Sequence, residues 1–187
     1  PHNYNLNDFL KLKSYLLKSE RFLEIEKNSE IDEIIRMGES RQVEFKSTMR
    51  FDIRANRISK DREKDILRTI AGFQNTEGGT LIIGVEDDGE IFGIEKDGFK
   101  NHDKFLLHLD NLINTHLKPT LSLNYESIVR NIYNKSIAII RVKSSPFPIY
   151  LKWQSDEEFY IRSGPNTRKL SASEIVSFVS SKYKNMN

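Results

Sequence analysis

The apolar run from Thr80 to Val85 constrains the fold of this chain more than any other feature. A continuous apolar stretch of this length predicts a strand buried on both faces. An amphipathic segment, Asp61 to Gln74, precedes it and predicts a helix, and the turn sequence Asp87-Asp-Gly89 follows it. We therefore expect an α+β fold, in which a mixed β-sheet of about five to seven strands is flanked by helices.

Other segments fill in this arrangement. Residues 1–37 carry apolar residues at helical spacing and are expected to form an N-terminal helical extension, so that the domain itself covers residues 38–187. The stretch from Ser47 to Lys60 has no periodicity and predicts a loop. Further strands are expected at 42–46, 121–125, 137–142, 147–153 and 158–162, and further helices at 102–117 and from a capping box at Ser171.

Composition excludes several classes of protein. The 187 residues include no cysteine, so neither a disulfide framework nor a cysteine-ligated zinc site can form. No apolar run approaches the roughly 20 residues of a membrane span, and no signal peptide is visible. We expect a cytoplasmic protein without a membrane partner. Because the chain starts at Pro1, we also expect it to be a piece of a longer protein.

Charge is distributed unevenly along the chain. The segment from Lys46 to Arg68 contains eight basic and four acidic residues, and the segment from Arg130 to Asn187 contains ten basic and four acidic residues. The segment between them, Thr69 to Val129, has four basic and ten acidic residues. This asymmetry favours a polyanionic partner, although the solvated faces of an ordinary soluble protein give the same pattern.

A nucleotide site is not indicated. The chain has no Gly-x4-Gly-Lys-Ser/Thr string, which P-loop enzymes use to hold phosphates. Gly78-Gly79 leads from a helix into a strand, the opposite order to a phosphate-binding loop. We expect no nucleotide cofactor, and the chain is not a P-loop nucleotide-triphosphatase.

The string Glu44-Phe-Lys46 places a carboxylate and an ammonium group on one face of a strand, with Glu39 shortly before it. Metal-dependent nucleases use such a pair, in which the carboxylate holds the metal and the lysine stabilises developing charge. The alternative is a surface ion pair worth ~0–1 kcal/mol. Asp87, or the adjacent Glu86, would add a metal ligand if the end of its strand lies beside Glu44, and is otherwise simply turn chemistry.

Basic and aromatic residues alternate near the C-terminus. Tyr160 and Arg162 share one face of a strand, and Tyr150 and Lys152 share a face of another, a pattern typical of base stacking with phosphate contact and equally of half-buried sheet residues. Arg168 and Lys169 precede a helix N-terminus, where backbone amides and cations can hold a phosphate.

Three segments, in the same order, resemble the Schlafen AlbA-type domain family, formerly described as divergent AAA. They are Gly38 to Ser47, Ile70 to Ile94 and Phe159 to Ser171. The resemblance extends from Gly38 to about Tyr183. It implies a DNA-binding domain of the kind that is attached to other modules in bacterial proteins.

Some animal Schlafen proteins that are similar in this region cut tRNA or rRNA with three carboxylates and a divalent metal. The resemblance maps these carboxylates onto Glu39, Glu44 and Asp87, with Glu86 as the adjacent alternative, and implies Mg²⁺ or Mn²⁺. The animal nucleases clamp RNA between two related lobes. This chain has one copy of the motifs, so cutting would need a homodimer or a further lobe.

Three functional hypotheses follow. The first is a nucleic-acid-binding domain, for DNA or RNA, within a larger bacterial regulatory or defence protein. Its expected contacts are Lys46, Lys152, Tyr160, Arg162, Arg168 and Lys169. The second is a metal-dependent endoribonuclease, in which Glu39, Glu44 and Asp87 hold the metal and Lys46 polarises the scissile phosphate. The third is an oligomerisation or regulatory module that pairs through its N-terminal helices.

Overall fold

The computed structural model describes residues 6–17, 20–119 and 124–183. The chain divides into two units, Pro1–Met37 and Gly38–Asn187. The first unit consists of helices α1 (Leu6–Leu17) and α2 (Glu20–Met37). Large apolar side chains of α1, among them Leu6, Phe9 and Leu10, are exposed. None of the helices within the described ranges is both long and apolar enough to cross a membrane.

The first sheet of the second unit is built around the strand that the apolar run predicts. Its strand order is β1-β4-β7-β6, and β1 runs parallel to β4 while the other neighbours are antiparallel. Leu81, Ile82 and Ile83 of β4 are fully buried, which confirms a strand covered on both faces. The bounds are β1 (Val43–Lys46), β4 (Gly79–Ile83), β6 (Tyr125–Ile132) and β7 (Lys135–Val142). Leu121 and Leu123, which we expected in a strand, lie outside the described residues.

A second sheet differs from the expectation of one larger sheet. It is antiparallel in the order β10-β9-β8-β5, with β5 (Leu117–Lys118), β8 (Tyr150–Trp153), β9 (Asp156–Ser163) and β10 (Asn166–Lys169). Pro146 and Pro148 stand between β7 and β8, where they interrupt strand pairing, and the chain crosses there to the second sheet.

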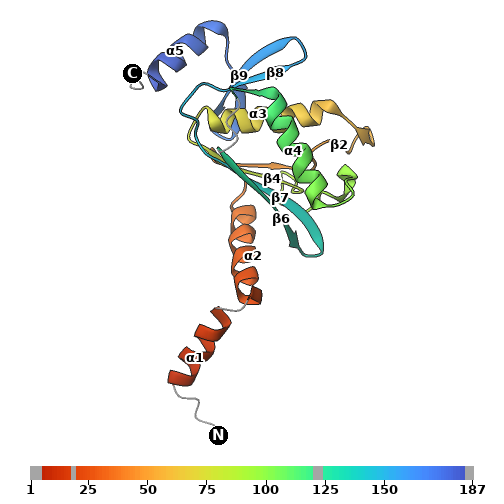
Figure 1. Cartoon of the computed structure of the whole chain (residues 1–187), viewed down its shortest axis with the longest axis vertical. Helices are drawn as coiled ribbons and strands as arrows, with labels where there is room; N and C mark the ends of the chain where they lie inside the picture. The colour runs from red at the N-terminus through yellow and green to blue at the C-terminus, as the bar shows by residue number, and fades with distance from the viewer. Residues whose placement is uncertain (1–5, 18–19, 120–123, 184–187) are drawn as a thin grey trace. The chain divides into compact units, whose positions relative to one another are not determined.

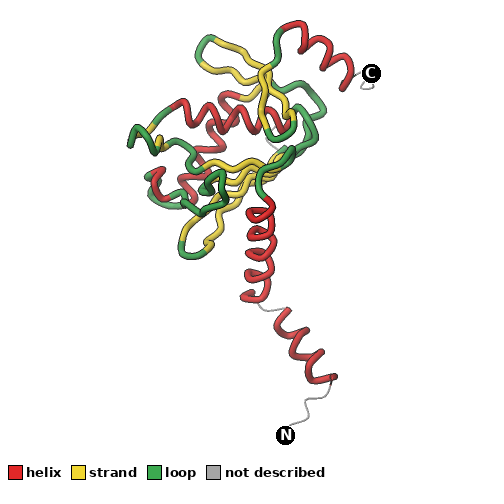
Figure 2. The backbone as a smooth tube through the Cα atoms, turned by 180° about the vertical axis from the view of Figure 1, so that it is seen from behind, coloured by secondary structure: helices red, strands yellow, loops and turns green. Residues whose placement is uncertain are grey.

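Helix α3 (Lys60–Gln74) lies between the two sheets and contacts strands of both (Figures 1 and 2). Its apolar residues Ile66, Leu67, Ile70 and Phe73 are fully buried and form the centre of the core. Two further helices, α4 (His102–His116) and α5 (Ala172–Lys182), and a 3-10 turn, η1 (Glu95–Asp97), complete the unit. The mixed α+β class is thus confirmed, with helices flanking a mixed sheet.

The stretch from Ser47 to Lys60 is not the structureless loop that its sequence predicts. It contains a hairpin of β2 (Phe51–Asp52) and β3 (Arg57–Ile58). The carboxylate of Asp97 fixes the start of this hairpin, because it accepts hydrogen bonds from the backbone N–H groups of Met49, Arg50 and Phe51 at 2.8–3.0 Å. The contact spans more than 45 residues of sequence, which explains why local periodicity does not reveal it.

Candidate functional site

A cleft of about 640 Å³ opens where the first sheet, the hairpin and α3 meet. Because β1 and β4 are parallel, their carboxyl ends reach the same edge of the sheet and deliver Lys46 and the Glu86–Asp88 turn to this cleft. Its walls carry charges of both signs. The cations are Lys46, Arg54 and Arg62, and the carboxylates are Asp65, Glu86, Asp87 and Asp88.

The structure brings together the three acidic residues that the sequence singles out. Glu39 Oε1 accepts a hydrogen bond from the Phe45 backbone N–H at 2.8 Å. Partial burial raises the pKa of Glu39, and the charges of Glu44 and Asp87 raise it further, whereas the Phe45 hydrogen bond and the charge of Lys46 act in the opposite direction. These four side chains are therefore electrostatic neighbours.

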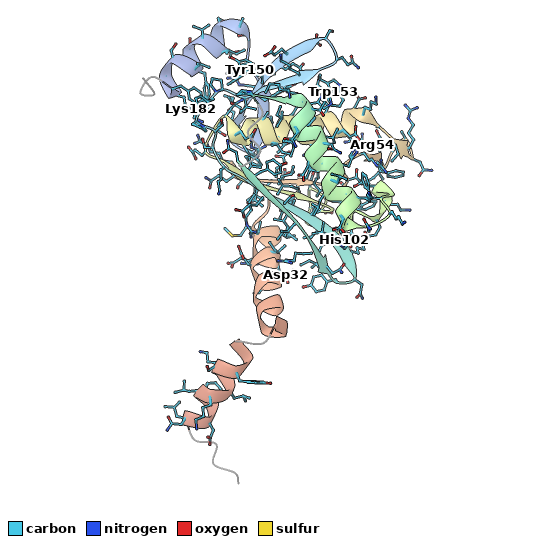
Figure 3. The ribbon with its side chains drawn as sticks, in the orientation of Figure 1. Asp32, Arg54, His102, Tyr150, Trp153 and Lys182 are labelled. Carbon is cyan, nitrogen blue, oxygen red and sulfur yellow. The ribbon has the colours of Figure 1, made fainter. Side chains whose placement is uncertain are left out.

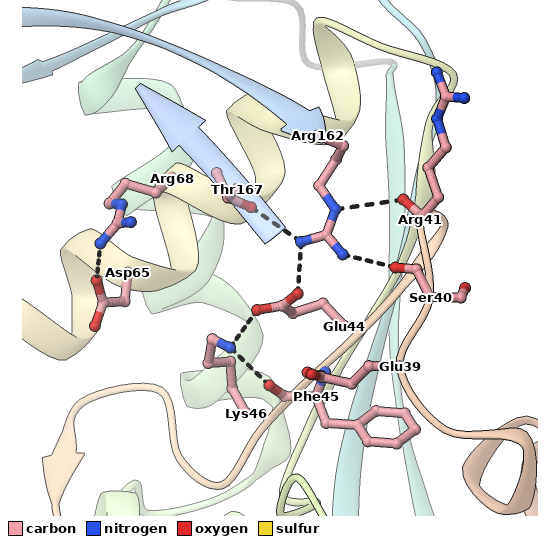
Figure 4. A network of polar contacts seen from close by, with 10 residues as sticks. All are labelled: Glu39, Ser40, Arg41, Glu44, Phe45, Lys46, Asp65, Arg68, Arg162 and Thr167. Carbon is pink, nitrogen blue, oxygen red and sulfur yellow. Dashed lines mark hydrogen bonds and ion pairs between the residues drawn. The ribbon is translucent and has the colours of Figure 1, made fainter. Parts of the chain in front are cut away.

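Glu44 is held by two cations. Its Oε2 accepts a hydrogen bond from Arg162 Nη1 at 2.5 Å, and its Oε1 accepts one from Lys46 Nζ. The rest of the Arg162 guanidinium is also satisfied, as Figure 4 shows. Its partners are the Ser40 carbonyl at 2.8 Å, the Arg41 carbonyl at 3.3 Å and Thr167 Oγ1 at 3.0 Å. The ion pair therefore ties β1 to β9, across the two sheets.

This arrangement does not fit a three-carboxylate metal site. Both oxygens of Glu44 already accept hydrogen bonds from cations, and one oxygen of Glu39 is bound to the Phe45 backbone. Across the described ranges, no group of three or more acidic or histidine side chains is placed to hold a metal ion. Asp87 is exposed at the rim of the cleft.

The structure corrects the nucleic-acid contacts expected of Tyr160 and Arg162. The Arg162 side chain is 0% exposed because it serves the ion pair with Glu44, and Tyr160 is 4% exposed. The two side chains share one face of β9, as expected, but that face packs against α3: the Arg162 guanidinium lies over the Phe73 ring and that of Arg68 over the Tyr160 ring. Neither is available to stack on a base or to bind a phosphate.

Of the other expected contacts, Lys46 is half-buried and paired with Glu44, and three are exposed but also paired with carboxylates. Lys152 lies 3.5 Å from Glu157, and Arg168 lies 2.6 Å from Glu174. Lys169 lies 2.8 Å from Glu158. Burial acts to raise the pKa of Glu158, but hydrogen bonds from Lys169, Lys64 and Tyr160 outweigh it and lower the pKa to about 2. The second sheet therefore offers cations whose charge is largely neutralised within the fold.

Several exposed cations form no ion pair with a described carboxylate, and three of them lie on the hairpin and just after it. Arg54, Arg57 and Lys60 are exposed, and none forms an ion pair with a carboxylate in the described part of the chain. Figure 3 places Arg54 at the outer edge of the domain. These three residues were not among the expected contacts, although the excess of basic residues between Lys46 and Arg68 is a signal that points to them.

Comparison with known proteins agrees with the resemblance. Residues 39–171 match the family described as Schlafen, AlbA_2. Among solved structures, the DIP2311 protein of Corynebacterium diphtheriae has 20% sequence identity and a TM-score of 0.55, which shows a shared fold; the match covers 76% of this chain and 24% of that protein. The N-terminal domain of a RecG-related protein of Nitrosomonas europaea has 21% identity and a TM-score of 0.44, covering 70% of this chain and 79% of that one.

The ion pair between Glu44 and Arg162 generates a prediction about stability. Replacement R162A leaves a buried carboxylate with only Lys46 as its partner, so we expect the free energy of unfolding to fall by about 3–5 kcal/mol. The measurement is urea denaturation followed by circular dichroism. R168A removes an exposed ion pair and should leave the midpoint unchanged. Equal midpoints for the two variants would contradict the structural role of Arg162.

Glu158 generates a prediction about pH. Because its pKa in the folded protein is about 2, below the ordinary value of 4.5, its ion pairs contribute stability above pH 4.5 that is lost as the pH falls through about 2. E158Q should lower the unfolding midpoint at pH 7, and its difference from wild type should shrink as the pH approaches 2. E157Q, which alters an exposed pair, is the control, and a difference for E158Q that does not change with pH would refute the assignment.

Proposed function

Because the chain belongs to the Schlafen, AlbA_2 family, we propose that it is a nucleic-acid-binding domain that serves as one module of a larger protein. The phosphates lie along the hairpin side of the cleft, where Arg54, Arg57 and Lys60 contact them. The affinity is mainly electrostatic, so it decreases steeply as the salt concentration rises.

The observation that supports this proposal is which exposed cations form ion pairs within the protein and which do not. Cations on the second sheet must give up an internal carboxylate before they can bind a phosphate. Arg54, Arg57 and Lys60 form no ion pair with a described carboxylate, so they can bind a phosphate without breaking one. All three lie within a stretch of seven residues. Phosphate contacts from such side chains position a protein on nucleic acid without reading its sequence.

Binding without cutting is the activity that the arrangement of acids favours. Glu44 is engaged by Arg162 and Lys46, and no three acidic or histidine side chains of the described residues are placed to hold a metal together. The carboxylates of Glu86, Asp87 and Asp88, which also line the cleft, repel phosphates. They therefore direct the nucleic-acid backbone toward the hairpin.

The test is incubation of the purified chain with labelled tRNA, single-stranded DNA and duplex DNA, with Mg²⁺ or Mn²⁺ present. We expect salt-sensitive binding and no cleavage. K60E should weaken binding, whereas K143E, which changes an exposed lysine just after β7, should leave it nearly unchanged. D87N should bind as well as wild type or better, because it removes a negative charge beside the site.

The choice of Asp87 keeps the test independent of folding. E44Q would disturb the buried ion pair, whereas Asp87 is exposed and D87N leaves that pair intact. Metal-dependent cleavage by wild type that D87N abolishes would replace the proposal with a nuclease. Absence of salt-sensitive binding to all three nucleic acids would overturn it.

A second proposal concerns pairing of two copies through α1. The helix exposes Leu6, Phe9, Leu10, Leu12 and Tyr15, more apolar surface than one short helix ordinarily leaves in water. We expect the full chain to form a homodimer in light scattering, and F9E/L10E to be a monomer. L107E, which changes an exposed leucine of α4, should keep the wild-type mass. A monomeric wild type would refute this pairing.

A further inference from the structure

The β2–β3 hairpin has an unusual exposed tip. Residues 53–58 read Ile-Arg-Ala-Asn-Arg-Ile. Because Asp52 pairs with Arg57 and Phe51 pairs with Ile58, Ile53 and Arg54 lie in the four-residue turn, and Arg57 and Ile58 lie in β3. The backbone of Asn56 adopts a left-handed conformation, with φ of 48°, as a tight turn requires. Ile53 is 41% exposed and Ile58 is 51% exposed. The hairpin thus exposes an isoleucine next to an arginine in its turn and a second such pair in β3.

The base of the hairpin is held firmly to the domain. Three backbone N–H groups at its start donate to Asp97, and Arg50 Nε donates to the Asp97 carbonyl at 2.8 Å. The Arg50 guanidinium lies 3.8 Å from the centre of the Phe99 ring, and the Ser59 N–H donates to the Arg50 carbonyl at 2.8 Å. The exposed tip is therefore presented on a fixed base rather than on a loose loop.

The single carboxylate of the hairpin, Asp52, lies close enough to Arg54 for their charges to interact, but it forms no ion pair with Arg54 or Arg57. Asp52 Oδ1 accepts hydrogen bonds from the backbone N–H groups of Arg54 and Ala55, at 2.9 and 3.0 Å. Its Oδ2 lies 3.7 Å from Arg62 of α3. Arg57 stands opposite Asp52 in the strand register, but it forms no ion pair with it. The Arg54 and Arg57 guanidinium groups therefore remain available to an external anion.

We propose that this hairpin enters the major groove of duplex DNA, with Arg54 and Arg57 on the phosphates that flank the groove and Ile53 and Ile58 against the base edges. The inference rests on the proposed function and names its partner. The groove of B-DNA is about 12 Å wide and admits a two-stranded ribbon, and thymine methyl groups offer apolar contacts to its side chains.

Other nucleic acids fit this hairpin less well. The major groove of an RNA duplex is deep and narrow, and side chains cannot reach its bases. Single strands are bound by stacking on exposed aromatic rings. The hairpin's own aromatic residue, Phe51, is half-buried and lies opposite Ile58 in β3. The four turn residues of the hairpin, 53–56, include no aromatic residue. Its apolar residues are short and branched, which suits a groove rather than a stacking surface.

The experiment is fluorescence anisotropy with the full chain and three probes: a B-form DNA duplex, an RNA duplex of the same sequence and single-stranded DNA. Wild type should bind the DNA duplex about tenfold more tightly than the other two. R54A/R57A should weaken DNA binding by about tenfold, and the slope of log affinity against log salt should decrease by about 0.9 for each phosphate that the variant no longer binds. I53S/I58S should weaken binding without changing that slope.

Two control variants separate the contacts from net charge and from folding. R41A/K143A removes the same two charges from elsewhere on the domain and should retain the wild-type affinity. R54K/R57K keeps the charges and should recover most of the binding, which a hairpin that fails to fold could not do. Circular dichroism of every variant checks that the fold is kept.

The outcomes distinguish this inference from the proposed function. If R54A/R57A weakens salt-sensitive binding but I53S/I58S binds as R41A/K143A does, entry into the groove is wrong and the proposed function stands. If neither double variant weakens salt-sensitive binding, the placement of the phosphates on the hairpin fails as well. Equal affinity for the RNA duplex or for the single strand would also overturn the choice of duplex DNA. If wild type binds none of the probes, both fail.

Discussion

The buried ion pair between Glu44 and Arg162 is the interaction on which the rest of the domain depends. It joins β1 at the edge of the first sheet to β9 in the second, and the Arg162 guanidinium also lies over Phe73 of the helix between them. A charge removed from water is tolerated only when its partner and its remaining hydrogen bonds are in place, and both conditions are met here. Lys46, which completes the pairing of Glu44, lines the cleft, so the packing of the two sheets positions one wall of the site.

Because Glu44 belongs to the structural ion pair, it is not a free ligand for chemistry in the cleft. Glu39, Glu44 and Asp87 do lie near one another, but both oxygens of Glu44 are engaged by Lys46 and Arg162. The same pairing of charges holds on the second sheet, where Glu157, Glu158 and Glu174 bind the exposed cations. Among the exposed cations without such pairing, Arg54 lines the cleft and Arg57 and Lys60 lie close to it in sequence, which is why we place the phosphates there.

Features that depend on local sequence could be predicted. The apolar run predicted the central strand β4, the amphipathic segment at 61–74 became α3, and the capping box of Ser171 and Glu174 opens α5 as expected. Features that depend on contacts distant in sequence could not. Arg162 alternates with Tyr160 like a surface residue, and only its partner 118 residues away shows that it is buried. The hairpin likewise depends on Asp97, which lies 46 to 48 residues beyond the amides that it binds.

The central claim is that nucleic acid contacts the hairpin side of the cleft rather than the paired cations of β10 and α5. The most direct measurement is a titration of the ¹⁵N-labelled chain with a short DNA duplex, followed by amide chemical shifts. The account predicts that the largest shift changes fall on residues 51–60 and on the walls of the cleft, and that they diminish at high salt. Changes concentrated on Arg168, Lys169 and the first turn of α5, with the hairpin unaffected, would contradict it.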